Sequence, residues 1–507
     1  MQLIKRLWQD KPLQLILFAG LFFRMLAVIF SKGFGMFDDH FLVIEAAQSW
    51  VDGEDYNYWL PSLSDPNRQP QGHSLFYVGI IYYILYFFKA TGLDDPQAKM
   101  YLIRLIHGLF SLLVIYYAYK IAEKKGGEKV AKLTGIVLSL FWMLPFLSVR
   151  NLVEVVCIPP LLAATWMLVK HDQEKGIKSF VYAGLLLGCA FSIRFQTVLF
   201  TAGFGLALVF MKQLKGALVT GLCFALVACA MQGGIDYVIW HRPFAEFQEY
   251  VSYNINNAAN YPVGPWHLYL MFLSGVLIPP ISLFLFFGYF RLWRKQLLLF
   301  LPAFVFLVFH SYFPNKQERF ILPFLPFLVI LGFIGWMDFY NKSAFWKKRP
   351  GLYSGFWVFF WIMNSIALLF ISVSYSKRNR VESMCYIAAQ KDVVNLIVED
   401  GNRDDFQMPP LFYLQKWISP YSVTKNISAR EVWLKYIHLP KSEQPNYVVF
   451  YQAENIARRV GFMKYYFPQM HYETTVEPSA IDKLMHFLNP ENNENHTTYI
   501  FKLKSPN

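Results

Sequence analysis

The sequence is short of charged residues. Asp, Glu, Lys and Arg make up 16% of its 507 residues, whereas 55% are hydrophobic and 19% are aromatic. A soluble protein carries roughly 25% charged residues, so this composition excludes an ordinary soluble domain and predicts a membrane protein. The net charge of +13 gathers in small basic clusters at the ends of apolar runs, as it does in cytoplasmic flanks of membrane spans. No Lys/Arg stripe with interleaved aromatics occurs, so we expect no nucleic-acid partner.

Cysteine is also scarce, with five residues in the chain. Four of them (Cys157, Cys189, Cys223 and Cys229) lie inside apolar runs, where cysteine acts as a small packing residue. Cys385 stands alone in the C-terminal region, so no intrachain disulfide is expected there. Neither a C-x-x-C nor an H-E-x-x-H pattern occurs, and we predict no metal site.

The apolar runs predict about eleven transmembrane helices. A helix needs about 20 apolar residues to cross a bilayer. The first run is longer than the apolar core of a signal peptide, so we interpret it as an uncleaved span. The predicted spans lie near residues 13–31, 101–119, 133–149, 152–170, 178–193, 195–212, 216–239, 267–290, 297–313, 320–338 and 353–375.

The apolar run 74–90 decides the topology. If it crossed the membrane, nearly every basic loop, including 120–132 and 341–350, would lie outside, against the positive-inside rule. The run is short and rich in Tyr and Phe, which is typical of the interface. We therefore predict that 74–90 is an interfacial helix of the first outer loop. The outer segments are then 32–73, the turns at 150–151 and 193–195, 240–266 and 314–319.

The chain changes character after about residue 376. Residues 447–451 (YVVFY) and 498–503 (TYIFKL) have strand patterns, and 383–398 has a helix pattern. We predict a transmembrane domain over 1–375 and a small external α/β domain over 376–507.

An acidic pair, Asp38 and Asp39, follows the first span in the stretch GMFDDHFLVIEAAQSW. One interpretation is a helix cap, a position that favours Asp. The other is a general base, which must reach the proton it removes. A carboxylate at the outer boundary of the lipid could serve a substrate whose leaving group stays in the bilayer.

The stretch HSYFPNKQERFILP places Lys316 and Arg319 in an outer turn, against the positive-inside trend. They either mark the interface as snorkelling side chains or bind a phosphate, for which Arg is bidentate and Lys a point charge. Glu318 is placed to orient one of them. His310, near the outer end of its span, is either a donor to the same phosphate or a satisfied core histidine.

Two further arginines lie at the outer ends of spans. An ionisable group at membrane depth is costly and faces a cavity or a partner. Arg150 and Glu154 have the i, i+4 spacing of a helical ion pair, which is one explanation of Arg150. Arg194 has no partner nearby in the sequence, which favours a role facing a cavity.

The outer loop within 236–270 carries Tyr253, Asn254, Trp266 and His267. One interpretation is the belt of aromatic residues that membrane proteins commonly have at the membrane–water interface. Aromatics mixed with Asn can also bind sugars, through stacking on ring faces and amide hydrogen bonds. Both interpretations stay open.

Taken together, these segments resemble the GT-C polytopic mannosyltransferases of glycosyltransferase family 22, the type that extends lipid-linked glycans and GPI-anchor precursors. The resemblance covers roughly residues 13–340. Family members usually read His-Lys-Glu-x-Arg-Phe where this chain reads Asn-Lys-Gln-Glu-Arg-Phe at 315–320, and Asp-Glu where it has Asp38-Asp39. Lys316 and Arg319 are kept, which indicates a divergent member.

The resemblance implies transfer of a hexose, mannose in the family, from a polyprenyl-phosphate carrier to a hydroxyl of a glycan or lipid-linked acceptor, with inversion. It assigns the base to Asp38, with Asp39 beside it, and requires no cofactor other than the lipid-phosphate sugar. Membrane lipid is the remaining expected partner. The residues expected at the donor phosphate are Lys316, Arg319, His310, Arg194 and Arg150, and those expected at the acceptor are Tyr253, Asn254, Trp266 and His267.

The main alternative is a flippase or transporter of a lipid-linked saccharide. A transporter would need polar residues along its spans at both leaflets, whereas here they gather at one. We predict a bacterial inner membrane with the site facing the periplasm; an ER membrane with a lumenal site is the alternative.

Overall fold

The computed structural model describes residues 2–62, 65, 67–170, 176–490 and 494–503. The chain forms two compact units. The helical unit comprises Met1–Val28, Tyr58–Ile80 and Ile103–Ser372, and the sheet unit comprises Ile29–Asn57, Ile81–Leu102 and Val373–Asn507. The helices α2 (Pro12–Phe30), α5 (Leu75–Ala90) and α6 (Pro96–Gly126) contribute residues to both units.

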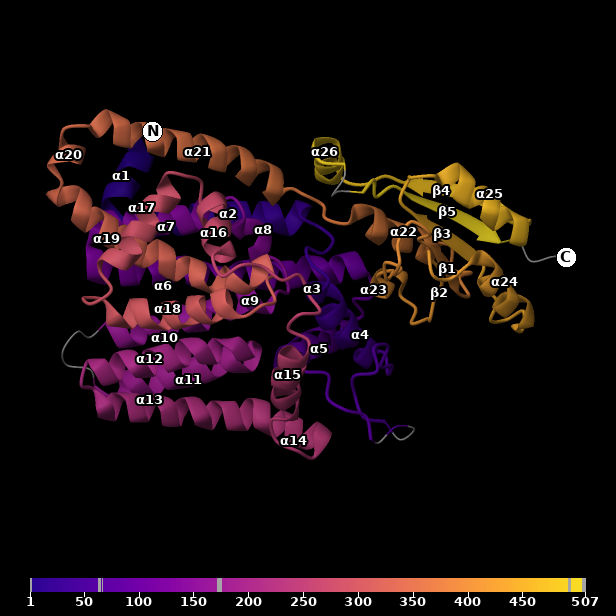
Figure 1. The fold of residues 1–507 in the computed structure, drawn as a ribbon, viewed down its shortest axis with the longest axis horizontal. Coiled ribbons are helices and arrows are strands. Elements are labelled where there is room, and N and C mark those ends of the chain that lie inside the picture. The colour runs from indigo at the N-terminus through magenta and orange to yellow at the C-terminus, as the bar shows by residue number, and fades with distance from the viewer. Residues whose placement is uncertain (1, 63–64, 66, 171–175, 491–493, 504–507) are drawn as a thin grey trace. The chain divides into compact units, whose positions relative to one another are not determined.

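The helical unit is a bundle of helices (Figure 1). The run predicted over 74–90 forms the helix α5, whose first residues belong to this unit. Its other helices are α1 (Gln2–Asp10), α7 (Glu128–Leu140), α8 (Leu144–Ser148), α9 (Val153–Val156), α10 (Ile158–Val169), α11 (Ile177–Ile193), α12 (Val198–Phe210), α13 (Leu214–Val227), α14 (Gly234–Trp240), α15 (Ala245–Asn256), α16 (Leu268–Val276), α17 (Ile281–Arg291), α18 (Leu297–Tyr312), α19 (Leu325–Lys342), α20 (Ala344–Lys347) and α21 (Pro350–Ser372). Short π or 3-10 segments are η2 (Phe195–Thr197), η3 (Ala228–Gly233) and η4 (Glu318–Phe324).

The protein is an integral membrane protein with several apolar helices. In the part of the chain that the structure describes, five helices are long and apolar enough to cross a membrane by length and composition, and further apolar helices are shorter. The five are Pro12–Phe30, Pro96–Gly126, Leu214–Trp240, Glu318–Lys342 and Pro350–Ser372. The total of about eleven spans, and the interfacial place of α5, stay predictions.

Proline divides two of the predicted runs. The run 267–290 is not one helix but α16 and α17, which are separated by residues 277–280. Pro279 and Pro280 lie in this gap and lack the N–H groups that a continuous helix needs. The run 152–170 is likewise divided into α9 and α10, and α10 begins with prolines in its first turn, where proline is tolerated.

The helix α19 lies at the centre of the bundle. Of the apolar window within Glu318–Lys342, 94% is buried, against 17% for Pro350–Ser372. A Cβ on Gly288 of α17 would lie 1.9 Å from the carbonyl oxygen of Gly332 of α19, so the two helices meet backbone to backbone. The exposed apolar side chains of α21 instead face outward, as expected for a helix in contact with lipid.

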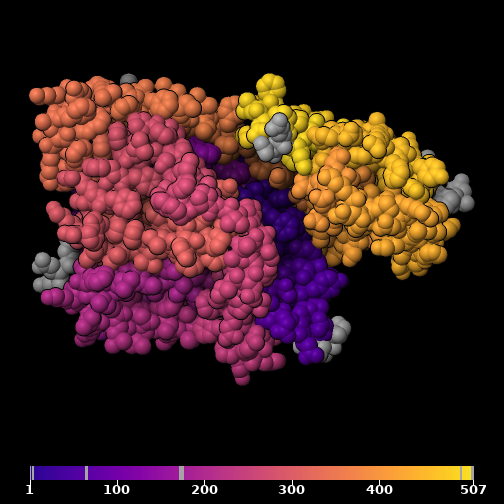
Figure 2. Space-filling model, viewed as in Figure 1, coloured from indigo at the N-terminus to yellow at the C-terminus, as the bar shows by residue number. Residues whose placement is uncertain are grey.

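The space-filling view shows the side chains of the helical unit filling the spaces between its ribbons on this face (Figure 2). Several ring pairs contribute to this packing, such as Phe284 stacked on Trp336 at 3.9 Å between centroids. The interior is therefore packed at close contact, as protein interiors are.

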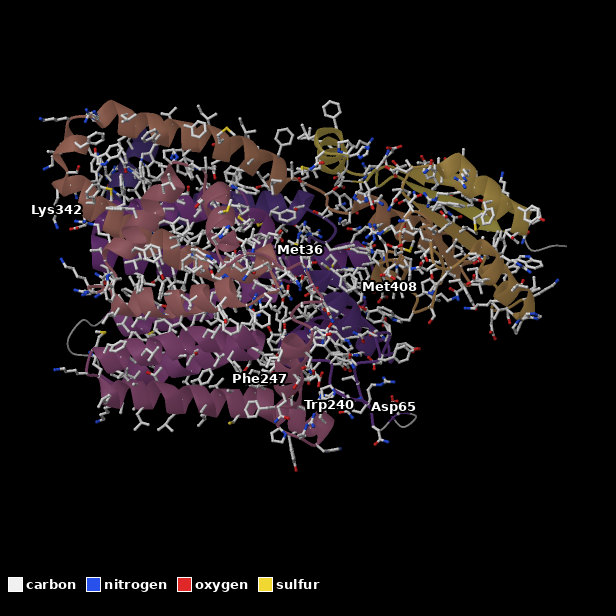
Figure 3. All side chains as sticks on the ribbon, viewed as in Figure 1. Met36, Asp65, Trp240, Phe247, Lys342 and Met408 are labelled. Atoms are coloured by element: carbon white, nitrogen blue, oxygen red, sulfur yellow. The ribbon has the colours of Figure 1, made fainter. Side chains whose placement is uncertain are left out.

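The two ends of the helical unit differ in chemistry. Lys342 lies at one end, and Trp240 and Phe247 lie at the other (Figure 3). The end that carries Lys342 is called the basic end below. There, Asp338 accepts hydrogen bonds from both Arg291 and Lys342. Trp240 and Phe247 belong to the predicted outer loop 240–266, and which end of the helical unit faces outward stays a prediction.

The sheet unit contains a five-stranded sheet with the order β2-β1-β3-β5-β4. The strand β1 pairs in parallel with β2 and β3, whereas β5 pairs antiparallel with β3 and β4. Its elements are α3 (Asp38–His40), η1 (Phe41–Glu45), α4 (Ala46–Val51), α22 (Arg378–Ala389), β1 (Leu396–Glu399), α23 (Leu411–Leu414), β2 (Tyr421–Val423), α24 (Ala429–His438), β3 (Tyr447–Tyr451), α25 (Ile456–Tyr466), β4 (Met470–Val476), α26 (Ala480–Leu488) and β5 (Thr498–Leu503).

The predicted strands 447–451 and 498–503 are confirmed as β3 and β5, and a small C-terminal α/β fold is present. The helix predicted over 383–398 is wrong in its second half, because α22 ends at Ala389 and 396–399 is the strand β1. Lys391 has a φ of +60°, which stops the helix. All four residues of β1 are buried, as expected for a parallel strand covered on both faces. The functional boundary at 375/376 stays a prediction.

Cysteine labelling tests which end of the helical unit faces the cytoplasm. In a chain whose five native cysteines are alanine, Tyr312→Cys at the exposed end of α18 should react with an impermeant maleimide on intact cells. Lys124→Cys at the end of α6 should react only after permeabilisation, because we place the basic loop 120–132 inside. Labelling of both positions from the same side would contradict the topology.

Candidate functional site

Two arginines and one glutamate meet within the helical unit. Arg194 Nη1 lies 2.9 Å from Glu154 Oε1, and Arg319 Nε lies 3.9 Å from the same oxygen. The three side chains come from the end of α11, from α9 and from η4. Glu154 and Arg194 are buried, with 3% and 5% of their surface exposed. Residues far apart in the sequence therefore form one charged cluster.

Two glutamines orient these arginines. Arg194 Nε donates to Gln196 Oε1 at 2.9 Å. Arg319 donates to Gln317 Oε1 through Nε at 3.0 Å and Nη2 at 2.8 Å. Each glutamine lies two residues from its arginine in the sequence. The backbone is extended at Arg194 and at Gln317, which lets each glutamine side chain reach the guanidinium group of its arginine. The expectation that Arg194 has no partner nearby in the sequence is therefore wrong.

The ring of Phe320 lies between the two guanidinium groups. Arg194 Cζ lies 5.5 Å and Arg319 Cζ 5.4 Å from its centroid, within the range of a cation–π contact. The ring of His310 lies 6.5 Å from the same phenyl ring, edge to face. The structure thus brings together Arg194, Arg319 and His310 from the set expected at the donor phosphate.

The charges of this cluster favour an anion. Two guanidinium groups face one carboxylate, so the cluster keeps a net positive charge. Glu154 Oε2 has no hydrogen-bond partner among the described residues. Planar guanidinium groups bind phosphate through paired hydrogen bonds. The attraction between opposite charges is also stronger in a buried setting, where the dielectric constant is low.

Lys316 has a different place in the turn. Its ammonium group donates to the carbonyl oxygens of His310 at 2.6 Å and Ser311 at 2.8 Å, and also to that of Phe313. These carbonyls belong to the end of α18, where a cation is favourable. Burial lowers the pKa of Lys316. Its part in binding phosphate stays a prediction; the contacts show that it closes the turn.

The aromatic loop pairs with this turn. Lys316 N donates to Pro262 O at 3.0 Å, and Val263 forms an isolated antiparallel bridge with Asn315. The hydroxyl of Tyr269 accepts from Gln317 N and donates to Gln317 O. The outer loop 257–267 is therefore held beside the residue that orients Arg319.

The residues expected at the acceptor lie in or next to this loop. Tyr253 is 43% and Trp266 66% exposed. The hydroxyls of Tyr253 and Tyr261 share a hydrogen bond, and Asn254 Nδ2 donates to Tyr250 O at 2.8 Å. Trp266 and His267 form an edge-to-face pair at 5.4 Å. Such exposed rings offer stacking faces, and their role in binding sugar stays a prediction.

Arg150 is buried with 2% exposure, and its guanidinium lies 4.4 Å from the ring centre of Phe146. The next residue, Asn151, donates to the hydroxyl of Tyr77 at 3.3 Å, and that hydroxyl lies 2.6 Å from His107 Nε2. The place of Arg150 at the donor phosphate stays a prediction.

Asp38 and Asp39 belong to the sheet unit and differ in their surroundings. Asp39 is buried, and its two carboxylate oxygens accept from Gly35 N at 2.8 Å and Met36 N at 2.9 Å. It therefore holds its own loop in the way that capping acids do. Asp38 is partly exposed. Of the two carboxylates, that of Asp38 is the more accessible.

A buried glutamate that the sequence did not single out joins two outer loops. Glu246 Oε2 accepts from Gly72 N at 2.7 Å and His73 N at 3.0 Å, and Glu246 N donates to Asp236 Oδ2. Burial raises the pKa of Glu246 to about 7, and these N–H donors oppose the shift. Gly72 has a φ of +77°, and a Cβ there would lie 3.0 Å from Tyr250 Cα, so only glycine fits this contact.

The described residues contain no group of three His, Cys, Asp or Glu side chains placed to hold a metal ion. Whether the reaction uses a metal or another cofactor is not tested by this observation, and the absence of both stays a prediction.

The helical bundle with its small C-terminal sheet has the architecture of the GT-C glycosyltransferases. Residues 15–408 match the model of the Alg9-like mannosyltransferase family. The chain belongs to this family and is a glycosyltransferase. Membership confirms the family resemblance of the sequence. It also favours the transferase interpretation over the flippase alternative.

Solved structures with the same fold include two membrane enzymes. ArnT from Cupriavidus metallidurans, bound to undecaprenyl phosphate, is 14% identical with a TM-score of 0.60 and covers 97% of this chain and 99% of its own. The oligosaccharyltransferase of Archaeoglobus fulgidus, in complex with Zn and sulfate, is 10% identical with a TM-score of 0.51 and covers 92% of this chain and 72% of its own. The sequence matches no curated protein.

Replacement of Glu246 should change how stability depends on pH. Its pKa in the folded protein, about 7, lies above the ordinary 4.5, so the stabilising contribution is complete below about pH 4.5 and is lost as the pH rises through 7. The loss is on the order of 3 kcal/mol. Thermal unfolding in detergent between pH 5 and pH 8 should show a smaller pH effect in Glu246→Gln than in the wild type. Glu249→Gln, on the same helix, is the control and should keep the wild-type slope.

Proposed function

We propose that this protein transfers a hexose, mannose in its family, from a polyprenyl-phosphate carrier to a hydroxyl of a glycan or lipid-linked acceptor. The observation that carries the proposal is the buried cluster of Arg194, Arg319 and Glu154 in the helical unit. The ligand of ArnT, undecaprenyl phosphate, supports a donor of the same chemical class. The transfer takes place on the non-cytosolic face.

The donor phosphate would meet the arginines. As the bond between the sugar C1 and the phosphate oxygen breaks, the leaving polyprenyl phosphate gains negative charge. Preorganised guanidinium groups stabilise charge at the place where it develops. Gln196 and Gln317 keep the guanidinium planes fixed before the donor binds, which lowers the cost of reorganisation. Lys316 adds a positive charge nearby, while its protons hold the turn.

Asp38 would act as the general base. It would take the proton of the acceptor hydroxyl, whose oxygen then attacks C1 from the face opposite the phosphate, with inversion of that carbon. The contacts of Asp39 with Gly35 N and Met36 N support a structural role for the second acid. The partial exposure of Asp38 supports its access to an acceptor.

The exposed loop would receive the acceptor. Tyr253, Trp266 and His267 offer ring faces, and Asn254 lies beside them on α15. Sugars stack their apolar faces on such rings, and a belt of the same kind also suits the interface. We propose that the bacterial inner membrane holds the protein, with this loop in the periplasm; an ER membrane with a lumenal site remains the alternative.

Replacement of Asp38 tests the base. Asp38→Asn should abolish transfer, with a loss of about 100-fold or more, while the protein still inserts and binds donor lipid. Asp94→Asn, at an exposed position before α6, is the matched control and should transfer normally. Measurement uses purified protein, labelled polyprenyl-phosphate mannose and a mixed acceptor pool. If Asp38→Asn turns over near normally and Asp39→Asn does not, the base is assigned to the wrong residue.

Replacement of Arg319 tests the donor site. Arg319→Ala should raise the apparent KM for the polyprenyl-phosphate sugar by about tenfold or more, since a charged hydrogen bond contributes roughly 1.5–3 kcal/mol, and should change the acceptor KM little. Arg294→Ala, at the basic end of the helical unit, removes a cation without touching the cluster and should leave both values unchanged. Equal increases of both KM values in Arg319→Ala would count against a phosphate role.

A further inference from the structure

The segment that carries Asp38 folds as part of the sheet unit. Residues 29–57 and 373–507 belong to the same compact unit. At the start of the segment, Ser31 Oγ donates to Ser374 O at 3.0 Å and Ser376 N donates to Lys32 O at 3.2 Å. Gly33 has a φ of +72°, and a Cβ there would lie 1.9 Å from Ser376 O. The backbone of the C-terminal region thus fixes where the acidic segment begins.

Glu45 joins the other end of this segment to the C-terminal region. Its Oε1 atom lies 3.1 Å from His40 Nε2 and accepts from Phe412 N at 3.1 Å. Glu45 is fully buried. The ring of His40 stacks on Phe34 at 4.7 Å and on Tyr413 at 5.4 Å. A single carboxylate therefore connects the residue that follows the acidic pair with the backbone of α23.

Arg380 of α22 contacts aromatic residues of the same segment. Its guanidinium lies 5.3 Å from the ring of Phe34 and 5.6 Å from the ring of Phe41, which flank the acidic pair in sequence. It also interacts with the charges of Glu45 and Asp400, and burial lowers its pKa while these carboxylates oppose the shift. It is 7% exposed. Arg380 thus adds a positive charge to the buried surroundings of Glu45.

The position of Arg380 in the sheet topology is informative. In the order β2-β1-β3-β5-β4, the chain leaves β1 toward β2 on one side and leaves β3 toward β4 on the other, so a topological switch point lies between β1 and β3. Open α/β sheets bind ligands outside the carboxyl ends of the strands at such a point. Tyr451 ends β3 and Asp400 follows β1. The guanidinium of Arg380 lies 5.9 Å from the ring of Tyr451 and interacts with Asp400. The place where such a sheet binds a ligand is here occupied by Arg380 and the aromatic residues of the acidic segment.

We propose that Arg380 and Glu45 are positioning residues for the transfer, and that the C-terminal domain serves the reaction by holding the Asp38 segment in place. This inference rests on the proposed role of Asp38 as the base. The domain uses its switch point for a segment of its own chain rather than for a separate ligand. It is therefore a part of the catalytic apparatus.

Replacement of Arg380 tests this proposal in the full-length enzyme. Arg380→Ala should lower kcat by about 100-fold, because a small displacement of a reacting group has an effect of that size. The KM for the polyprenyl-phosphate sugar should stay unchanged, since the arginine cluster of the helical unit is untouched. Arg380→Lys keeps the charge but not the planar group that lies over the rings, and should restore part of kcat. Glu45→Gln, which keeps an acceptor for Phe412 N, should also lower kcat without changing the donor KM.

Arg403→Ala is the matched control. Arg403 also lies in the C-terminal region, and its guanidinium pairs with Glu494 at 2.9 Å rather than with the acidic segment, as far as the described residues show. It should keep the wild-type kcat. All variants are assayed as monodisperse protein well below their thermal midpoints, so that unfolding does not contribute to the loss.

The outcomes separate the two proposals. If the wild type transfers sugar and Asp38→Asn does not, but Arg380→Ala keeps the wild-type kcat, the positioning role is wrong and the proposed function stands. An equal loss of kcat in Arg403→Ala, or a rise of the donor KM in Arg380→Ala with kcat unchanged, would also overturn it. If the wild type transfers no sugar from any polyprenyl-phosphate donor, the proposed function itself fails.

Discussion

The contact between Glu154 and Arg194 is the interaction on which the rest of the arginine cluster depends. A charge at membrane depth is costly unless it is paired, and here one carboxylate lies close to two guanidinium groups from distant parts of the chain. Removal of the glutamate would leave two cations facing each other around one phenyl ring. The pair therefore makes it possible to hold two arginines close together without a bound anion.

Much of the fold was predictable because composition and periodicity are local properties. The length of the apolar stretches identified the helical runs. The β-branched and aromatic residues identified the strands at 447–451 and 498–503. The division of 267–290 depends on Pro279 and Pro280, whose effect a hydropathy reading ignores. Most of the strand Leu396–Glu399 fell within the helix predicted over 383–398, because a short, fully buried strand has no alternating pattern to distinguish it.

The candidate site was predictable in part. The unusual positions of Arg194 and Arg319 identified them without a structure, since cations at the outer ends of spans need an explanation. Their partners Glu154, Gln196 and Gln317 were not assigned, because spacing in a sequence does not determine which carboxylate or amide reaches which guanidinium. Glu246 was missed for a similar reason: the donors of its hydrogen bonds lie in a loop more than 170 residues away.

The deep burial of α19 has a consequence for how a substrate is recognised. The turn that carries Arg319 continues directly into this helix, 94% of whose apolar window is enclosed by neighbours, and the backbone of α17 meets its backbone at Gly288. A helix enclosed in this way cannot tilt toward an incoming lipid. If the proposed site is correct, adaptation to substrates of different shape is expected in the exposed aromatic loop, and variation among related enzymes should concentrate there rather than around Arg194 and Arg319.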